Sequence, residues 1–141
     1  MSGYSLRCGK CDHVSWAANI VDLTKNHVGE NHMFKCGQCG AEAYLYLMST
    51  TLEGEEWERW VKGVIRIDYK RKDIRNYHPY VYLITHKGPK GKIDSVQISY
   101  YKDLRKEGKS LKHGHGPGGT PVLGISDLKG ILEKLQGIGV M

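Results

Sequence analysis

The sequence predicts an α+β protein built from a cysteine-rich N-terminal module, an antiparallel β-meander and a C-terminal amphipathic helix. Three observations lead to this prediction. All four cysteines form two Cys-x-x-Cys pairs near the N-terminus, the middle of the chain alternates apolar and polar residues, and the residues after Ser126 repeat leucine and isoleucine at helical spacing. We place a boundary after residue 52, which gives predicted domains of residues 1–52 and 53–141.

The four cysteines have the spacing of metal ligands. They form two pairs separated by 24 residues: Cys8 with Cys11, and Cys36 with Cys39. Two such pairs present four thiolates to one tetrahedral ion, and a closed four-cysteine shell leaves no position for water or substrate. Three glycines suit tight turns at these pairs: Gly9, Gly37 and Gly40. We therefore expect one structural Zn²⁺ that stabilises the fold and takes no part in catalysis.

Three other chemistries remain open for the cysteines: iron in the same all-sulfur geometry, a redox-active pair, or two disulfides. A redox site needs one reactive pair at a strand-to-helix junction, whereas this chain has two matched pairs. The N-terminus lacks the apolar run of a signal peptide, so we expect a reducing cytoplasm, where disulfides are rare. No apolar segment has the length of a membrane span, and we expect no membrane contact.

Residues 4–50 resemble a zinc ribbon, in which two cysteine turns, called knuckles, alternate with β-like stretches. The second knuckle, Cys-Gly-Gln-Cys followed by Gly40, matches the pattern well, whereas the first is followed by Asp12 where a glycine often stands. The 24 residues between the pairs exceed the usual spacing of about 15–20, and a longer hairpin accommodates the difference. The resemblance implies a zinc-stabilised β-hairpin module over about a third of the chain.

The N-terminal module is predicted to be mostly strand. Residues 14–21 are apolar with weak alternation and predict a strand, followed by a hairpin turn at 26–31. A short strand at 32–35 leads into the second knuckle. Residues 43–51 carry tyrosine and methionine on one face and leucine on the other, which predicts a strand buried on both faces.

Three further strands form the predicted meander: residues 60–70, 80–85 and 95–101. A glycine- and lysine-rich turn at 86–92 joins the last two. Residues 53–59 fit either helix or strand, because Trp57, Trp60 and Val61 have helical spacing while the next residues alternate.

The C-terminal helix is predicted to begin at Ser126 as its N-cap and to end at Gly137. Its apolar stripe consists of Leu128, Ile131, Leu132 and Leu135. We expect this stripe to pack on the meander.

The net charge of +6 is unevenly distributed along the chain. Residues 1–58 contain four basic and eight acidic side chains, a net charge of −4. Residues 59–112 contain fifteen basic and five acidic side chains, a net charge of +10, and residues 113–141 are neutral. Because phosphate binding needs concentrated Lys and Arg, the sequence directs a search for nucleic-acid contacts to the middle of the chain rather than to the cysteine module.

Residues 66–112 interleave cations with tyrosines, which is typical of a sheet surface that binds nucleic acid. The cations expected to contact phosphates are Lys70, Arg71, Lys72, Arg75, Lys87, Lys90, Lys92, Lys102, Arg105, Lys106, Lys109 and Lys112. The tyrosines considered for stacking are Tyr69, Tyr77, Tyr80, Tyr82, Tyr100 and Tyr101. The simpler interpretation is a solvated face whose tyrosines support the core. The leading hypothesis is a non-enzymatic, accessory or regulatory nucleic-acid-binding protein.

Two other functions stay open. The acidic N-terminal module fits an adaptor that docks onto a protein partner. The loop at 113–119, with His113 and His115 among glycines, fits an anion-binding loop or the centre of a metal-dependent hydrolase or nuclease. It lacks the phosphate-loop pattern, however, and a flexible connector is the simpler interpretation.

Overall fold

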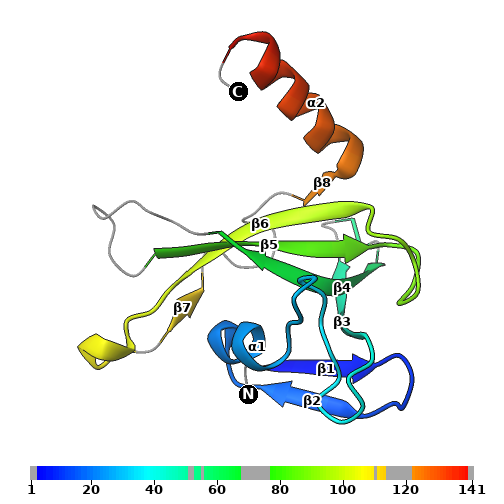
Figure 1. Cartoon of the computed structure of the whole chain (residues 1–141), viewed down its shortest axis with the longest axis vertical. Coiled ribbons are helices and arrows are strands. Elements are labelled where there is room, and N and C mark those ends of the chain that lie inside the picture. Colours follow the sequence, from blue (N-terminus) through cyan, green and yellow to red (C-terminus); the bar gives the residue numbers. More distant parts are fainter. Residues whose placement is uncertain are drawn as a thin grey trace.

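The computed structural model describes residues 3–50, 53–54, 56–67, 77–109, 111–113 and 122–139. Within these residues an antiparallel sheet has the strand order β2-β1-β3-β4-β5-β6-β7, with β8 paired to β6, and two α-helices accompany it (Figure 1). The predicted α+β class is confirmed. No helix of this described part is long and apolar enough to cross a lipid bilayer.

The N-terminal part contains β1 (Tyr4–Cys8), β2 (Val14–Ala17) and α1 (Ile20–Asn26). The strand predicted for residues 14–21 therefore ends early, and a helix takes its last positions. The Asn19 side chain accepts a hydrogen bond from the Asp22 amide at 2.9 Å, which caps the helix. Ile20 and Leu23 are both fully buried, and their spacing of three residues places them on one helical face.

The segment between α1 and the second knuckle is held by single β-bridges rather than by a strand. The bridges join Val28 to Phe34, Met33 to Gly63, and Lys35 to Glu42. The strand predicted at 32–35 is thus replaced by isolated bridges. One of them, Met33 to Gly63, places the segment against β4, where the Phe34 amide also donates to the Lys62 carbonyl at 2.9 Å.

The meander consists of β3 (Ala43–Thr50), β4 (Glu56–Arg66), β5 (Tyr77–Thr85) and β6 (Ser95–Lys102). The ambiguous segment 53–59 is strand from Glu56 onward, where β4 begins and pairs with β3. The register of β4 against β5 shifts between Val61 and Gly63. A Cβ atom on Gly63 would lie inside van der Waals distance of the His32 carbonyl oxygen, so the close approach at this bulge requires glycine.

The prediction that the strand at 43–51 is buried on both faces is wrong. Ala43 and Leu45 are buried, but Tyr46 is 44% exposed and Met48 is 54% exposed. The hydrophobic core lies on one face of β3 only, so the alternate residues face solvent.

The core joins the cysteine-rich part to the meander. Figure 1 shows β1, β2 and α1 lying below β4, β5 and β6. The core cluster includes Leu6 of β1, Leu23 of α1, Val61 of β4 and Ile84 of β5. Burial raises the pKa of Tyr4 to about 12, although its hydrogen bond with Tyr82 across the core opposes the shift. These contacts cross residue 52, so both predicted domains contribute to one core cluster. The division into domains 1–52 and 53–141 stays a prediction.

The C-terminal part contains η1 (Arg105–Glu107), β7 (Lys112–His113), β8 (Val122–Gly124) and α2 (Ile125–Gly137). The helix begins near the predicted position, but Ser126 is not its N-cap. Instead the Asp127 carboxylate accepts a hydrogen bond from the Gly124 amide at 3.2 Å.

The expectation that this helix packs on the meander is wrong, because α2 has no buried residue and projects beyond the sheet (Figure 1). Ile131 and Leu132 of its apolar stripe are 44% and 40% exposed. The physical reason is the connection: β8 pairs with β6, and α2 starts directly after it without a loop that could turn the helix back onto the sheet.

Candidate functional site

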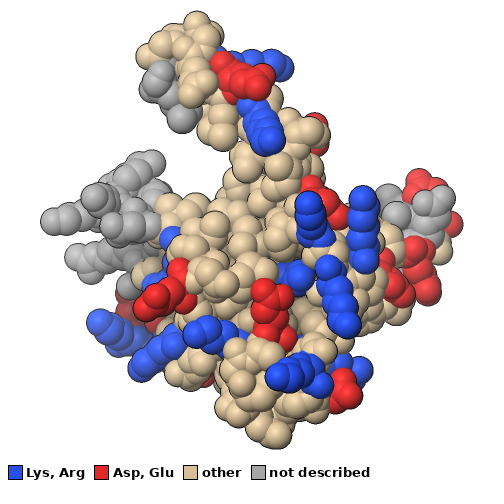
Figure 2. All heavy atoms as spheres, turned by 45° about the vertical axis from the view of Figure 1, so that its right-hand side comes forward, with Lys and Arg blue, Asp and Glu red and all other residues tan. Residues whose placement is uncertain are grey.

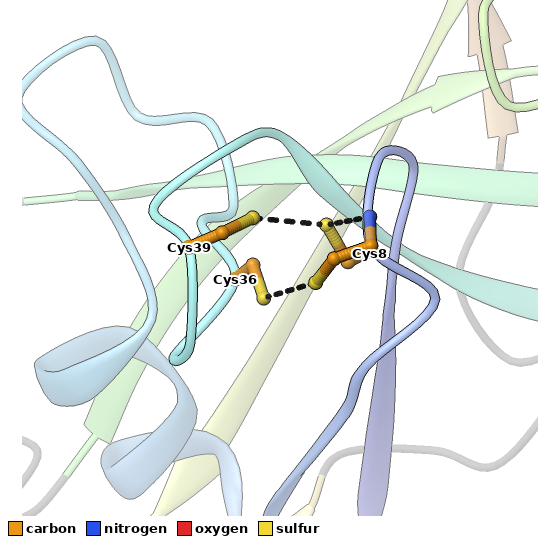
Figure 3. Close-up of side chains that lie close together, drawn as sticks. Cys8, Cys36 and Cys39 are labelled. Atoms are coloured by element: carbon orange, nitrogen blue, oxygen red, sulfur yellow. Dashed lines mark hydrogen bonds between the residues drawn. The ribbon is translucent and has the colours of Figure 1, made fainter.

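The four cysteine sulfurs form one compact cluster. The first knuckle follows β1 and the second precedes β3, and Figure 3 shows the side chains of Cys8, Cys36 and Cys39 turned toward one another. The sulfur of Cys8 lies 3.5 Å from that of Cys39, and the sulfur of Cys11 lies 3.7 Å from that of Cys36. All four lie within 4.8 Å of one another. A tetrahedron with Zn–S bonds of about 2.3 Å has edges of about 3.8 Å. The cluster therefore fits a single structural zinc ion.

These distances also bear on the other cysteine chemistries. A disulfide needs sulfurs about 2.05 Å apart, and all four cysteines are free. Among the described residues, the cluster consists of these cysteines without any histidine or carboxylate. His13, His27 and His32, which lie beside or between the two cysteine pairs in the sequence, are therefore not ligands of this centre.

Backbone amides point at the sulfurs, as expected for thiolates. The amides of Lys10 and Cys11 each donate to the Cys8 sulfur at 3.3 Å, and the Gln38 amide donates to the Cys36 sulfur at the same distance. The amides of Cys11 and Lys10 lower the pKa of Cys8 to about 6. The pKa of Cys36 is lowered as well, chiefly by the Cys39 amide. The Cys8 thiol is thus prepared to bind metal as a thiolate near neutral pH, and the amides at Cys36 favour its thiolate in the same way.

Cys11, by contrast, favours its protonated thiol form. The His13 amide favours its thiolate, but burial and the three neighbouring sulfurs outweigh that amide and raise the pKa of Cys11 to about 12. Four sulfurs this close resist carrying four negative charges together. A divalent cation removes that resistance, which supports a metal centre over four free thiols.

The two knuckles have related backbone conformations despite their different sequences. Gly40, after the second pair, has a φ of +76°, and Asp12, after the first pair, has a φ of +59°. Asp12 thus adopts the left-handed conformation that favours glycine. Gly9 and Gly37 have no positive φ. Gly37 is instead close to Ser15, whose hydroxyl accepts a hydrogen bond from the Gly37 amide at 3.1 Å.

Several predicted functional residues fall outside the described part of the chain. They are Lys70, Arg71, Lys72, Arg75, Tyr69 and His115. The backbones of Lys112 and His113 form β7, but their side chains are outside the description, as is the rest of the loop to residue 119. No observation therefore favours the hydrolase hypothesis at His113 and His115.

The remaining predicted cations form two groups at opposite ends of the β5–β6 hairpin. Lys87, Lys90 and Lys92 lie in the loop that joins the strands, whereas Lys102, Arg105, Lys106 and Lys109 lie at and beyond the other end of β6. The eight residues of β6 separate the groups by about 23 Å. The predicted continuous basic face is therefore divided, because a hairpin loop and a strand terminus are at opposite ends of any hairpin.

The group at and beyond the end of β6 (Lys102, Arg105, Lys106 and Lys109) is partly neutralised by a carboxylate. Arg105 forms a two-point contact with Asp103, with nitrogen–oxygen distances of 2.9 and 2.8 Å. This arrangement lowers the pKa of Asp103 to about 2, mainly through the hydrogen bond from Arg105. Lys106 and Lys109 are exposed.

The group in the β5–β6 loop, by contrast, lies beside two lysines that the sequence analysis did not predict as part of the site, Lys10 and Lys62. A pocket of about 350 Å³ is lined by Lys10 of the first knuckle, Lys62 of β4 and Lys90 of the β5–β6 loop, together with Pro89 and Tyr44. We call it the lysine pocket. Asp12 and Glu42 also line it. Figure 2 looks toward this end of the molecule and shows several Lys and Arg side chains close together, with carboxylates among them.

Lys62 is the most buried of the three lysines, with a side chain only 10% exposed. Its ammonium group donates to the Gly91 carbonyl at 3.2 Å and lies 3.9 Å from a Glu42 oxygen. The sequence carried a weak signal for it, since Lys62 alternates with the core residues of β4. No sequence pattern predicts that Lys62 lies near Lys10 and Lys90, because the three residues belong to three separate segments.

The predicted stacking tyrosines are mostly core residues. Tyr80, Tyr82 and Tyr101 are 3%, 8% and 2% exposed, so their rings are not available to bases. Tyr100 is half-buried, and the side chain of Tyr77 is outside the description. Trp57 of β4 is 41% exposed, and other accessible aromatic side chains lie on the uncovered face of β3 and its neighbours. There a groove of about 410 Å³ is lined by Ser5, Arg7, Val14, Tyr44, Tyr46 and Trp60. We call it the aromatic groove.

Comparisons of the chain with models of known protein families, with curated proteins and with solved structures find no match. The site geometry is therefore the basis for any functional conclusion.

Proposed function

We propose that this chain is a nucleic-acid-binding protein whose N-terminal zinc ribbon supports a phosphate-binding surface at the lysine pocket. The observation that carries the proposal is the convergence of Lys10, Lys62 and Lys90 from three segments on one pocket. The exposed loop lysines, Lys87 and Lys92, extend the positive charge beside it. Clustered lysines that line a concave surface are the electrostatic footprint of phosphate recognition.

The metal centre and the pocket are directly connected. Lys10 lies between the ligands Cys8 and Cys11, and its backbone amide donates to the Cys8 sulfur. The Gly9 amide donates to the Glu42 carbonyl at 3.1 Å, which attaches the knuckle to the start of β3. Zinc binding therefore determines where the Lys10 side chain begins, and loss of zinc is expected to remove one side of the pocket.

Charge balance is the competing explanation for these lysines. A zinc ion with four thiolates has a formal charge of −2, and nearby cations reduce the cost of holding it. The two explanations predict different losses. If the lysines only balance the centre, their removal weakens zinc retention; if they bind phosphate, their removal weakens nucleic-acid affinity while zinc stays bound.

Fluorescence anisotropy of labelled single-stranded and duplex DNA and RNA, titrated at several salt concentrations, tests the proposal. We choose Lys10→Gln with Lys90→Gln, because both side chains are exposed, and leave the buried Lys62 unchanged. Loss of two phosphate contacts lowers the slope of log K against log salt by about 1.4 for single strands or about 1.8 for duplex. Zinc content by elemental analysis is expected to stay at one per chain.

The matched control is Lys106→Gln with Lys109→Gln, which removes the same charge from the opposite end of the hairpin. This control is expected to change the slope of log K against log salt by less than half as much as the Lys10→Gln, Lys90→Gln variant does. Absence of binding to every nucleic acid at low salt contradicts the proposal, and so does an equal effect of the two double variants.

The adaptor hypothesis is retained as a second candidate because of one observation. β2 is an edge strand of the sheet, and its Val14 and Trp16 are 49% and 54% exposed. Exposed large apolar side chains on an edge strand are typical of protein contacts. If this hypothesis holds, a partner that the wild-type chain captures is lost on Trp16→Ser but kept by the Lys10→Gln, Lys90→Gln variant. If it fails, Trp16→Ser captures the same proteins as the wild type.

A further inference from the structure

We infer that the nucleic acid is single-stranded and that its bases stack in the aromatic groove while its phosphates contact the adjoining lysine pocket. The inference builds on the proposed function and specifies the form of nucleic acid that this surface selects. It concerns a part of the molecule that the sequence did not associate with binding, since the aromatic side chains expected to stack were those of the basic segment.

The groove is built by neighbouring strands that present alternate residues to one face. Tyr44 and Tyr46 are two residues apart on β3 and therefore share a face. Arg7 of β1 is directly opposite Tyr44, and Trp60 of β4 is directly opposite Tyr46. The rings of Tyr46 and Trp60 have centroids 5.6 Å apart and are tilted by 58°. The tilted rings present separate faces to a ligand in the groove.

The aromatic groove is open to solvent. Tyr46 is 44% exposed and Val14 on the opposite wall is 49% exposed, although both side chains would gain free energy from burial. The volume of about 410 Å³ lies within the range of small-ligand sites. An accessible aromatic surface of this kind accepts flat π-systems, and every nucleobase has one.

The aromatic groove and the lysine pocket are continuous, because Tyr44 lines both. Lys62 lies two residues after Trp60 on β4, at the bulge, and lines the lysine pocket together with Tyr44. Tyr44 therefore lies between a cation on β1, Arg7, and the cations of the lysine pocket. A surface with aromatic rings beside a path of cations is what a single strand requires, with bases on the rings and phosphates on the cations.

The acidic side chains near this surface indicate which part of it each portion of the strand occupies. Burial of the Tyr46 hydroxyl, together with the carboxylate of Glu58, raises the pKa of Tyr46. Glu58 lies beyond the Tyr46–Trp60 pair, away from Lys62, so a phosphate is disfavoured there. Glu42 is already paired with Lys62. The bases therefore lie over Tyr46 and Trp60, and the backbone follows the side of Arg7 and the lysine pocket.

A duplex cannot use the groove in this way. Its bases are paired and stacked inside the helix, and extruding one costs a few kcal/mol of unstacking and unpairing. The lysine pocket alone still attracts duplex phosphates. The surface is thus expected to favour single strands through the aromatic groove and to bind duplex only through charge.

The test compares Tyr46→Ala with Tyr46→Phe, which keeps the ring and removes the hydroxyl. Anisotropy titrations use labelled oligo(dT), oligo(U) and a duplex of the same length. We expect Tyr46→Ala to weaken single-strand binding by about 5- to 150-fold, because stacking on one aromatic side chain has that effect, and Tyr46→Phe to stay within twofold of wild type. Duplex affinity and the salt dependence of single-strand binding are expected to stay unchanged, since the lysines are intact.

A second measurement needs no variant. Stacking of bases beside Trp60 is expected to quench the tryptophan fluorescence of the wild-type protein during titration with oligo(dT), and a duplex is expected to leave it unchanged. Ile98→Ala, on β6 and 43% exposed, is the control for removing an exposed apolar side chain elsewhere. Its single-strand affinity should equal that of wild type.

The outcomes separate the inference from the proposed function. Equal affinity for duplex and single strand, or an unchanged affinity in Tyr46→Ala while the lysine variant binds weakly, overturns the inference and leaves the proposed function intact. Failure of every nucleic acid to bind overturns both. Capture of a protein that Tyr46→Ala loses, without any nucleic-acid binding, assigns the groove to a peptide ligand and also overturns the inference.

Discussion

Removal of zinc is the perturbation with the largest expected effect on this protein. The metal-free chain would hold four sulfurs within 4.8 Å of one another, with Cys8 only 1% exposed and Cys36 only 5% exposed. In that cluster the pKa of Cys8 is about 6 and that of Cys11 about 12, so the metal-free site carries thiolate charge without a compensating cation. The knuckles would then separate unless other contacts hold them.

The other contacts are too few to do so. The knuckles are attached to the rest of the fold by a small set of hydrogen bonds, among them Gly37 amide to Ser15 hydroxyl and Gly9 amide to Glu42 carbonyl at 3.1 Å. Each such bond contributes about 0.5–1.5 kcal/mol net. A structural zinc site contributes about 10–16 kcal/mol, comparable with or larger than the whole stability of a domain, about 5–15 kcal/mol.

We therefore expect the metal-free chain to lose the fold of its N-terminal part at 25 °C. The loss should extend into the meander, because Leu6, Leu45 and Val61 belong to one core cluster. Chelation with a strong zinc chelator, followed by circular dichroism, thermal unfolding and amide NMR spectra, measures the effect. Elemental analysis before and after treatment should give one zinc and no zinc per chain, and added zinc should restore the spectrum.

A chain shown to be metal-free that unfolds at the same temperature as the zinc-loaded chain would refute this reasoning. Protection of β5 and β6 amides in the metal-free chain, with loss of protection in β1 and β2, would instead support the predicted division into domains 1–52 and 53–141. Two metals per chain would contradict the single structural site.

Two further predictions concern the fold. Gly63→Ala should lower the free energy of unfolding by about 1–3 kcal/mol, measured by urea denaturation, because the added methyl group meets the His32 carbonyl. The control is Gly130→Ala, whose added methyl group meets no neighbour on helix α2 and should not destabilise the protein. Arg105 lowers the pKa of Asp103 to about 2, so this pair stabilises the folded state above the ordinary carboxyl pKa of about 3.9, and the contribution is lost as the pH falls toward 2. Carbon NMR titration of the Asp103 carboxyl should give the low value, and Arg105→Gln should return it to the ordinary one; a wild-type Asp103 that titrates at the ordinary value contradicts the pairing.

Elements with strong local patterns were predictable, and those that depend on distant partners were not. The strands at 80–85 and 95–101 alternate so regularly that the structure reproduces both within a few residues. The helix α1 has only seven residues and is too short to be stable alone, so its formation depends on the Asn19 cap and on burial of Ile20 and Leu23. Its local pattern was weak alternation, which misleadingly indicated a strand.

The binding surface was the least predictable part, for a related reason. Alternation shows that a strand has two different faces, but the partner that covers one of them decides which face is buried. Tyr80 and Tyr82 of β5 lie on the covered face, whereas Tyr44 and Tyr46 of β3 lie on the uncovered one. Cations counted along the chain gave a single basic segment, yet the hairpin separates that segment into two groups.

The sequence by itself determined the metal site. Two cysteines separated by two residues converge through a tight local turn, and thiolate chemistry limits what four such sulfurs can bind. Only the tertiary structure decided that the first knuckle lies against β4 and the β5–β6 loop, so that Lys10, Lys62 and Lys90 line one pocket beside an open aromatic groove. The difference is one of range: a knuckle is specified within a few residues, whereas a surface made from four segments depends on how the whole core packs.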